Sequence, residues 1–316
     1  MHVDDGIDKA SRTGRAARPL ARVSLKRHRE SLSALLFLLP AGIILFTFQF
    51  LPAVDVFRLS LTDRLLIRPF SNFVGLDNYQ RLMTDGRFWN SVGNTFYFVL
   101  ASVPLQIALA LSLALGLAGK VRAVGFFRTT FFLPVVASMV AVSVVWEWLY
   151  HPSVGLFNAV IELAGGTPVQ WLQSSQWAMP AIIILIVWKG TGYYMVIYLA
   201  GLMDIPKQYY EAAHIDGARK WDLFRYITWP MLAPTSYLVL VLQVINSFQV
   251  FAVVYVMTGG GPVRSTEVVV FYLYQRAFES FEFGYASAIS VAMFLFLVTA
   301  TILQRVFIGS KVSYER

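Results

Sequence analysis

The chain has 316 residues, of which 57% are hydrophobic and 14% are charged, and its formal net charge is +8. This composition is too apolar for a soluble domain and indicates an integral membrane protein. In a membrane protein, the excess of Lys and Arg over Asp and Glu reflects membrane topology and attraction to anionic lipid. It does not indicate nucleic-acid binding. The sequence contains no cysteine, which excludes disulfides and thiolate metal sites.

Six apolar runs reach the length of about 20 residues that a helix needs to cross a bilayer. They lie at about 32–57, 89–117, 126–149, 179–203, 233–257 and 285–308. The runs are unbroken and do not alternate with polar residues as the strands of a barrel would. Because backbone polar groups in lipid must be satisfied within the segment, each run is predicted to be a helix. We therefore expect an all-α integral membrane fold with six transmembrane helices, in which 32–309 form one domain.

The first 30 residues contain eight Lys or Arg. The apolar run that follows is too long for a signal peptide and contains Pro40, which predicts a retained first span after a basic segment at 1–31. With this segment in the cytoplasm, 18 of the 26 Lys and Arg residues fall in cytoplasmic segments, as the positive-inside rule requires. We expect both termini in the cytoplasm, with 310–316 as a short tail.

The external loops carry few distinctive signals. A short amphipathic helix is expected around Asn78 to Met83, within the loop at 59–88. Trp146, Glu147 and Trp148 lie at the external end of the third span, where an aromatic belt is the simplest interpretation and guidance of a sugar into the pathway is the alternative. The third external loop opens with Gly-Gly-Gly-Pro at 259–262, which we interpret as a turn.

Lys189 lies in the middle of the fourth span, where a charge costs at least ~2.5 kcal/mol on insertion scales. Such a residue usually faces a cavity or a partner. Gly190 and Gly192 let backbone groups approach a cavity, and Tyr193 and Tyr194 add hydroxyls and aromatic faces of the kind that suit a sugar. The alternative is a structural role, in which the ammonium group pairs with a carboxylate of a neighbouring subunit or snorkels to the interface.

A polar and basic segment, 211–234, interrupts the apolar sequence between the fourth and fifth spans. Pro206 suits a first helical turn, and the helix it begins is expected to run through Ile215. Asp216-Gly217 then ends this helix. Gly217 is able to adopt the left-handed conformation, and Asp216 is able to cap a second helix at 218–229. Either another protein binds this segment, or the segment lies on the membrane as an amphipathic helix.

The fifth span supplies a polar face. Gln243, Asn246, Ser247 and Val250 fall at i, i+3, i+4 and i+7, so a helix places them on one side. Gln249 lies about 60° away. These residues either contact a substrate or hold neighbouring helices together.

Several activities lack the residues they need. The glycines at 259–261 are not followed by the Lys of a phosphate-binding loop, so the chain carries no ATPase of its own. The four histidines lie outside the apolar runs, which leaves no metal site or acid–base cluster for an intramembrane enzyme. An ion-coupled carrier usually places a carboxylate within a span, and only Glu147 comes near, at a span end.

The segment at 211–234 also matches a long signature: E-A-A, two residues, D-G-A, five residues, F, two residues, I, two residues, P, three residues, P. Its slots are filled by Glu211, Ala212, Ala213, Asp216, Gly217, Ala218, Phe224, Ile227, Pro230 and Pro234. With it the chain resembles the permease subunits of binding-protein-dependent ABC importers. The stretches FVGLDNY, FRTTFFLP, WKGTGYYM and MTGGGP are similar to the maltose-type, carbohydrate branch. The resemblance extends from about residue 32 to the end.

The resemblance implies a type I ABC importer permease fold in the inner membrane of a bacterium or archaeon. Its partners would be a second homologous permease, two ATPase subunits that bind ATP and Mg, and an extracytoplasmic substrate-binding protein. The loop at 204–232 would carry a coupling helix seated in a groove of the ATPase, with Gly217 at the closest approach. The coupling residues would be Glu211, Ala212, Ala213, Asp216, Gly217 and Ala218. The chain itself would be no enzyme and would hold no cofactor.

The same resemblance implies transport of a di- or oligosaccharide by alternating access. Its sugar site would draw on the fourth and fifth spans, at Lys189, Gly190, Tyr193, Gln243, Asn246, Ser247 and Gln249. Similar permeases carry glycerol phosphate or its diesters, and Lys189 would suit a phosphate oxygen. An ion-coupled secondary transporter is the remote alternative.

Overall fold

The computed structural model describes residues 36–68, 70–119, 123–307 and 309. The predicted basic segment 1–31 and the predicted tail 310–316 lie outside the described residues. The chain divides into two compact parts, 1–55 and 56–316, and each is described by itself.

The first part contributes most of the first span. Residues 36–45 are helical and continue through the π-helical turn η1 (Phe46–Phe50) into α2 (Leu51–Leu59), which together form the span Leu36–Leu59. Pro52 lacks an N–H for the carbonyl four residues earlier, which fits a widened turn directly before it. Every side chain from 36 to 55 is exposed, so this apolar helix is suited to contact with lipid or another subunit.

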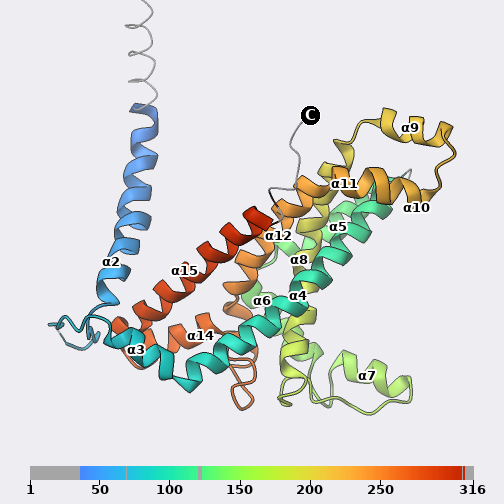
Figure 1. Cartoon of the computed structure of the whole chain (residues 1–316). Helices are drawn as coiled ribbons and strands as arrows, with labels where there is room; N and C mark the ends of the chain where they lie inside the picture. Colours follow the sequence, from blue (N-terminus) through green and yellow to red (C-terminus); the bar gives the residue numbers. More distant parts are fainter. Residues whose placement is uncertain (1–35, 69, 120–122, 308, 310–316) are drawn as a thin grey trace, which may run out of the picture. The chain divides into compact units, whose positions relative to one another are not determined.

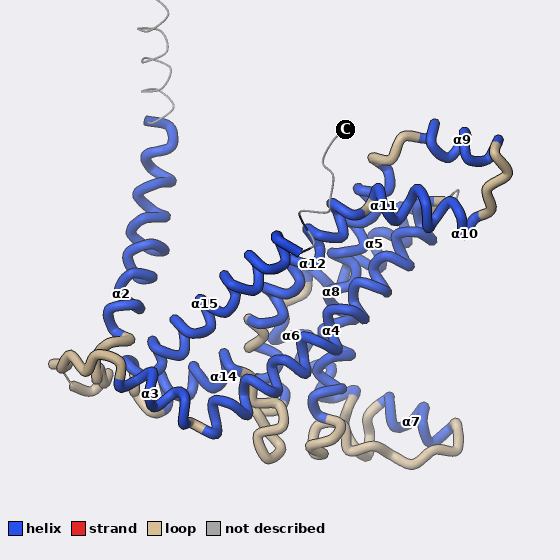
Figure 2. Tube along the Cα trace, in the orientation of Figure 1, coloured by secondary structure: helices blue, strands red, loops and turns tan. Residues whose placement is uncertain are grey.

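The described residues of the second part form helices joined by loops, and their one β feature is an isolated antiparallel bridge between Thr62 and Phe73 (Figure 2). The predicted all-α fold is thereby confirmed. The elements in chain order are α3 (Asp77–Thr84), α4 (Gly86–Ala118), α5 (Val124–Val136), α6 (Met139–Leu149), α7 (Leu156–Leu163), α8 (Ala178–Met203), α9 (Lys207–Ile215), α10 (Lys220–Leu223), the π-turn η2 (Phe224–Thr228), α11 (Trp229–Met231), α12 (Ala233–Phe248), α13 (Ala252–Met257), α14 (Val269–Tyr274), the π-turn η3 (Gln275–Glu279) and α15 (Phe283–Phe307).

Helices α4 and α8 form the centre of this part. They pack along each other, while α5 packs on α8 and α12 packs on both. The outer segments α6 and α13 pack against one another. The helices α9 and α10 lie at one end of the second part, and α7 lies at the opposite end (Figure 1). The predicted helix in the first external loop is confirmed as α3, whereas α7 and α14 were not predicted.

Five helices are long and apolar enough to span a membrane, and the bent pair α5–α6 brings the number to six when it is counted as one span. On that count the six predicted spans are confirmed, but the third is not the continuous helix that we expected. Its two halves meet at an angle of 98°. The break falls at Ala137 and Ser138, which have extended backbone dihedral angles.

Lys189 explains how this break is tolerated. Its Nζ donates hydrogen bonds to the carbonyl oxygens of Pro134, at 2.9 Å, and Val135, at 3.1 Å. In a continuous helix these carbonyls would accept from the backbone N–H groups of residues 138 and 139. The ammonium group thus replaces two lost helical bonds and places a positive charge at the carbonyl end of α5, where the helix dipole favours it.

The fifth span is also interrupted. We expected one helix over 233–257, but α12 ends at Phe248 and α13 begins at Ala252. Val250 therefore follows the break and does not sit at position i+7 of a continuous helix. It is nevertheless buried on the same side as Ser247, because both line the cavity described below.

A polar network joins α3, α4, α14 and α15 at the end opposite α9. Asp85 caps α4 by accepting from the backbone N–H groups of Arg87 (2.9 Å) and Phe88 (3.3 Å). Its carboxylate also accepts from the hydroxyls of Tyr272 and Tyr285. Burial raises the pKa of Asp85, but these hydrogen bonds outweigh it and hold the pKa below its ordinary value of 3.8.

The Lys189 bonds can be tested through the geometry of the break. Lys189→Met should leave two carbonyls unpaired, at a cost of about 1–3 kcal/mol each. The angle between α5 and α6 should then change or become heterogeneous. Because the chain has no cysteine, Thr129→Cys and Val145→Cys, both at exposed positions, can carry spin labels. Their distance distribution should shift or broaden in Lys189→Met.

Lys189→Arg, which keeps a cation with several N–H donors, is the matched control and should retain a narrow distribution. An unchanged distribution in Lys189→Met would show that the two bonds do not hold the break.

Asp85 should contribute to stability in a pH-dependent way. Its folded pKa is lowered, so the stabilisation is present above pH 3.8 and is lost as the pH falls through the folded value. At pH 7, Asp85→Asn should lower the free energy of unfolding by about 1–3 kcal/mol. Asp77→Asn, at an exposed acid of α3, is the control and should have little effect. Equal melting temperatures for the two variants at pH 7 would contradict this role.

Candidate functional site

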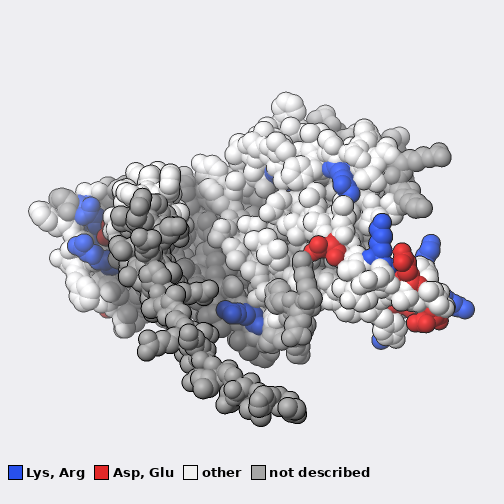
Figure 3. Space-filling model, turned by 90° about the horizontal axis from the view of Figure 1, so that it is seen from above, with Lys and Arg blue, Asp and Glu red and all other residues white. Residues whose placement is uncertain are grey.

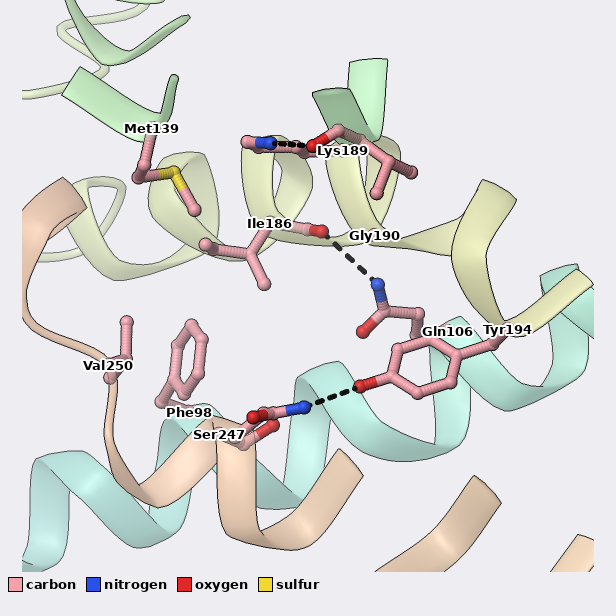
Figure 4. Close-up of a pocket in the computed structure, with 11 residues that line it drawn as sticks. Phe98, Gln106, Met139, Ile186, Lys189, Gly190, Tyr194, Ser247 and Val250 are labelled. Carbon is pink, nitrogen blue, oxygen red and sulfur yellow. Dashed lines mark hydrogen bonds between the residues drawn. The ribbon is translucent and has the colours of Figure 1, made fainter. Parts of the chain in front are cut away.

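A cavity of about 210 Å³ lies at the level of the two breaks, between α4, α8, the α5–α6 junction and the end of α12. Figure 4 shows the side chains around it. It is lined by Phe98, Gln106, Val135, Met139, Ile186, Lys189, Gly190, Tyr194, Asn246, Ser247 and Val250.

Gln106 is the centre of the cavity's polar contacts. Its side chain is buried in the middle of α4 and donates to the carbonyl oxygen of Ile186 at 3.2 Å. Its own amide oxygen accepts from Gln243 at 2.7 Å. The backbone of Gly190 lies directly against the Gln106 side chain, so that a Cβ at residue 190 would collide with the Gln106 amide. A side chain at residue 190 would therefore displace Gln106 from this position.

Asn246 and Tyr194 form a second polar contact on the cavity wall. The Asn246 amide donates to the Tyr194 hydroxyl at 3.2 Å (Figure 4). Ser247 and Phe98 line the cavity beside them, the first a hydroxyl and the second an aromatic ring. The wall thus combines amides, hydroxyls and apolar surface, which is the usual composition of a small-molecule site.

Lys189 is 9% exposed and lines the cavity, but two of its three N–H donors are used by the carbonyls of α5. Among the described residues that line the cavity, no carboxylate faces it and no second cation accompanies it. Pairing with a carboxylate of a neighbouring subunit stays a prediction. The partners of Lys189 within the described chain are backbone carbonyls.

The structure brings together Lys189, Gly190, Asn246 and Ser247 of the predicted substrate residues. The other three lie outside the cavity wall: Tyr193 is 41% exposed, Gln243 is buried behind Gln106, and Gln249 is exposed just beyond the end of α12. Gln106 was not among the predicted residues. The only available signal was the one glutamine within the apolar run of the second span, which also contains Asn90 and Asn94.

The first helix of the loop at 204–232 is α9, which ends at Ile215 as predicted, with Asp216 as its C-cap. Gly217 follows with φ of +82°, in the left-handed region, and a Cβ there would meet no atom within 4 Å. The second helix differs from the prediction. It starts at Lys220 instead of 218, and its cap is Arg219, whose backbone N–H donates to Asp222 at 3.0 Å. Asp216 does not cap it.

At the end of the second part that carries α9, the charged side chains lie mainly on this loop, where acidic and basic groups are intermixed (Figure 3). Glu211, Ala212, Asp216 and Gly217 are exposed, while Ala213 and Ala218 are partly buried. Ile215 is 87% exposed, which is unusual for a large apolar side chain and suits a docking surface. Pro230 and Pro234 stand in the first turns of α11 and α12, where proline is tolerated.

No group of three or more His, Cys, Asp or Glu that could hold a metal ion is found in the part of the chain that the structure describes.

Comparison with known proteins shows which family this chain belongs to. Residues 82–310 match the family of the binding-protein-dependent transport system inner membrane component. The chain is 36% identical to the trehalose/maltose transport system permease protein MalF of Thermococcus litoralis, covering 87% of this chain and 93% of that protein. It is 37% identical to the lactose transport system permease protein LacF of Rhizobium radiobacter, covering 90% and 96%. The sn-glycerol-3-phosphate transport system permease protein UgpA of Agrobacterium fabrum is 31% identical, with coverage of 88% and 95%.

The fold is also that of a solved transporter. A crystal structure of a bacterial alginate ABC transporter, in complex with an alginate pentasaccharide-bound periplasmic protein, aligns with a TM-score of 0.76 at 23% identity. The alignment covers 89% of this chain and 95% of that one. With its apolar spans and these matches, the chain is a multi-pass inner-membrane protein of a bacterium or archaeon, and it belongs to the binding-protein-dependent transport system inner membrane component family of ABC transporter permeases.

Proposed function

We propose that this chain is the permease subunit through which an ATP-driven importer moves a saccharide across the inner membrane. The observation that carries the substrate class is the cavity wall of amides, hydroxyls and an aromatic ring. Sugars present hydroxyl groups around an apolar CH face, so such a wall can hydrogen-bond the rim and contact the face. Gln106, Asn246 and Ser247 supply hydrogen-bonding groups, and Phe98 supplies the ring.

A phosphate ester fits this wall less well. Phosphate recognition relies on charge-assisted hydrogen bonds, often from several cationic donors. Lys189 is the one cation among the described residues of the cavity wall, and two of its donors are occupied by α5 carbonyls. Of the three relatives named above, two are named as permeases for sugars and one as a permease for glycerol 3-phosphate. The occupied lysine favours the neutral saccharide.

The cavity of about 210 Å³ is smaller than the roughly 300–1,000 Å³ of typical ligand pockets. A disaccharide therefore requires the walls to move apart. Alternating access provides that motion: rigid groups of helices rock about the cavity and open it to one side at a time. A second homologous permease would supply the opposite wall, and an extracytoplasmic binding protein would deliver the sugar.

Energy would come from two partner ATPase subunits through the loop at 204–232. We assign the contact to Glu211, Ala212, Ala213, Asp216, Gly217 and Ala218. The exposed Glu211, Asp216 and Ile215 offer charge and apolar surface, and the small residues allow a partner to approach the backbone closely. In this proposal 32–309 form the transmembrane domain, flanked by cytoplasmic segments at 1–31 and 310–316.

The coupling assignment is tested by a matched pair of glycines. Gly217 and Gly165 have nearly equal φ values, +82° and +81°, and a Cβ at either meets no atom within 4 Å. Valine at either site should cost about 1–3 kcal/mol of backbone strain. In the assembled importer, Gly217→Val should nevertheless uncouple ATP hydrolysis from uptake, whereas Gly165→Val, in the loop after α7, should retain uptake.

Equal loss of uptake in the two glycine variants would contradict the coupling role, since strain alone would then explain the effect. Full uptake by Gly217→Val would contradict it as well.

The assignment of the cavity wall to substrate binding can be tested with variants of two polar residues that lie close together in the sequence. Asn246 lines the cavity, whereas Gln249 lies outside its wall. Loss of one hydrogen bond to the substrate costs about 1 kcal/mol, so Asn246→Ala should raise KM for uptake several-fold and Gln249→Ala should not. The measurement is uptake of radiolabelled maltose, trehalose and lactose by the full importer. Uptake of glycerol 3-phosphate and of none of these sugars would overturn the saccharide assignment.

A further inference from the structure

We propose that the chain holds a second, outer site for a saccharide, formed between α6, the loop before α8 and the loop after α13. The identity of its ligand rests on the proposed function, but its position follows from the structure. It would hold the sugar on the outer side of the apolar layer that closes the inner cavity.

The outer site is a hollow of about 440 Å³. It is lined by Glu147, Tyr150, His151, Pro152, Leu172, Gln173, Met257, Thr258, Gly261 and Pro262. Helix α6 connects it to the inner cavity, because Met139 lines the cavity and Glu147 lines the hollow. Eight residues of helix separate them by about 12 Å along its axis.

A packed apolar layer lies between the two sites. Val142 and Trp146 of α6 and Val253 and Val254 of α13 are all at most 8% exposed and belong to one hydrophobic cluster. Because α6 and α13 pack directly on each other, this layer closes the inner cavity on the side of the hollow. A ligand in the hollow is therefore held outside a closed barrier.

The hollow presents polar groups that are not already engaged. Glu147 is exposed and has no hydrogen bond or ion pair among the described residues. The backbone N–H groups of Ser153 and Val154 lie 3.3 Å from Nδ1 of His151 and donate to it. The imidazole proton is thereby assigned to Nε2, which can donate to a ligand. The Gln173 amide adds both donors and acceptors, whereas the Thr258 hydroxyl already bonds to the Val254 carbonyl at 3.1 Å and to the Thr266 hydroxyl at 2.7 Å.

The scaffold around these groups is rigid. The buried Asn158 donates to the carbonyls of Pro152 and Val169 at 2.8 and 2.9 Å, and it accepts from Trp171 Nε1 at 3.0 Å. These bonds fix the loop that carries Gln173. Tyr150, also buried, donates to the carbonyl of Ala181 at 2.9 Å and stacks among aromatic neighbours. A wall held in this way needs little reordering to bind a ligand.

The charge of the hollow disfavours an anionic ligand. Its described lining has one carboxylate and no Lys or Arg, which disfavours phosphate or carboxylate ligands. Apolar surface from Leu172, Met257 and the two prolines lies beside the polar groups. A polyhydroxylated molecule with a CH face matches both features.

The absence of cysteine from the chain allows a direct test. Single cysteines are introduced at Gln173 in the hollow, at Ser247 in the inner cavity and at Ser175, an exposed control that does not line the hollow. The full importer is reconstituted in nanodiscs, and labelling of this subunit by a small thiol reagent is timed with and without maltose, trehalose or lactose. A bound sugar slows labelling by the factor 1 + [L]/Kd, about tenfold at ten times Kd.

A sugar should slow labelling of Gln173→Cys and Ser247→Cys and leave Ser175→Cys unchanged. Adding Glu147→Ala should reduce protection at residue 173 and leave protection at residue 247 intact. Protection at 247 without protection at 173 would overturn the outer site and leave the proposed function standing. Protection at neither position by any of these sugars would overturn both. Equal slowing at residue 175 would show a general effect of sugar on labelling and would also overturn the outer site.

Discussion

The structure depends on one constraint, which is that a backbone carbonyl inside a membrane must find a hydrogen-bond donor within the protein. Breaking the third span at Ala137 and Ser138 removes the donors of Pro134 and Val135, and the ammonium group of Lys189 replaces both. The charge that looks costly in the sequence is thus compensated by two carbonyls and a helix terminus. The break in turn creates a cavity wall from the backbone and side chains around it.

The remaining polar contacts of the bundle lie at the same level. Gln243 bonds Gln106, Gln106 bonds the carbonyl of Ile186, and Asn246 bonds Tyr194, so that α4, α8 and α12 are joined where the cavity opens between them. In lipid, helices are not driven together by the hydrophobic effect, and such bonds together with close packing hold them. The same groups therefore serve as interhelical contacts and, in the proposed function, would also form the hydrogen-bonding surface for a ligand. The two interpretations of the polar fifth span are not exclusive.

The sequence predicted what depends on local pattern. Apolar runs of sufficient length gave all six spans, and the Asp-Gly pair gave the left-handed turn at Gly217. It could not predict the breaks, because nothing in the run around Ala137 shows that Lys189, 54 residues after Val135, replaces its hydrogen bonds. Gln106 was missed for the same reason: one glutamine in an apolar run acquires a role only when Gln243 and Gly190 are brought against it. Helical periodicity placed Gln249 near the polar face, but the helix ends before it.

Helix α8 gives the proposed transport cycle a mechanical connection. Lys189 holds the broken third span from the middle of this helix, and the loop at 204–232 begins at its end, Met203. Fourteen residues separate the two points, about 21 Å of continuous helix. In the proposed cycle, a displacement of the loop would move α8 as a rigid body, and α8 would carry α5 with it through the two hydrogen bonds. The outer segments α6 and α13 pack on each other and are separated from α5 and α12 by the breaks. They can consequently keep their mutual contact while the inner segments move, which is the relative motion that opens a cavity to one side at a time.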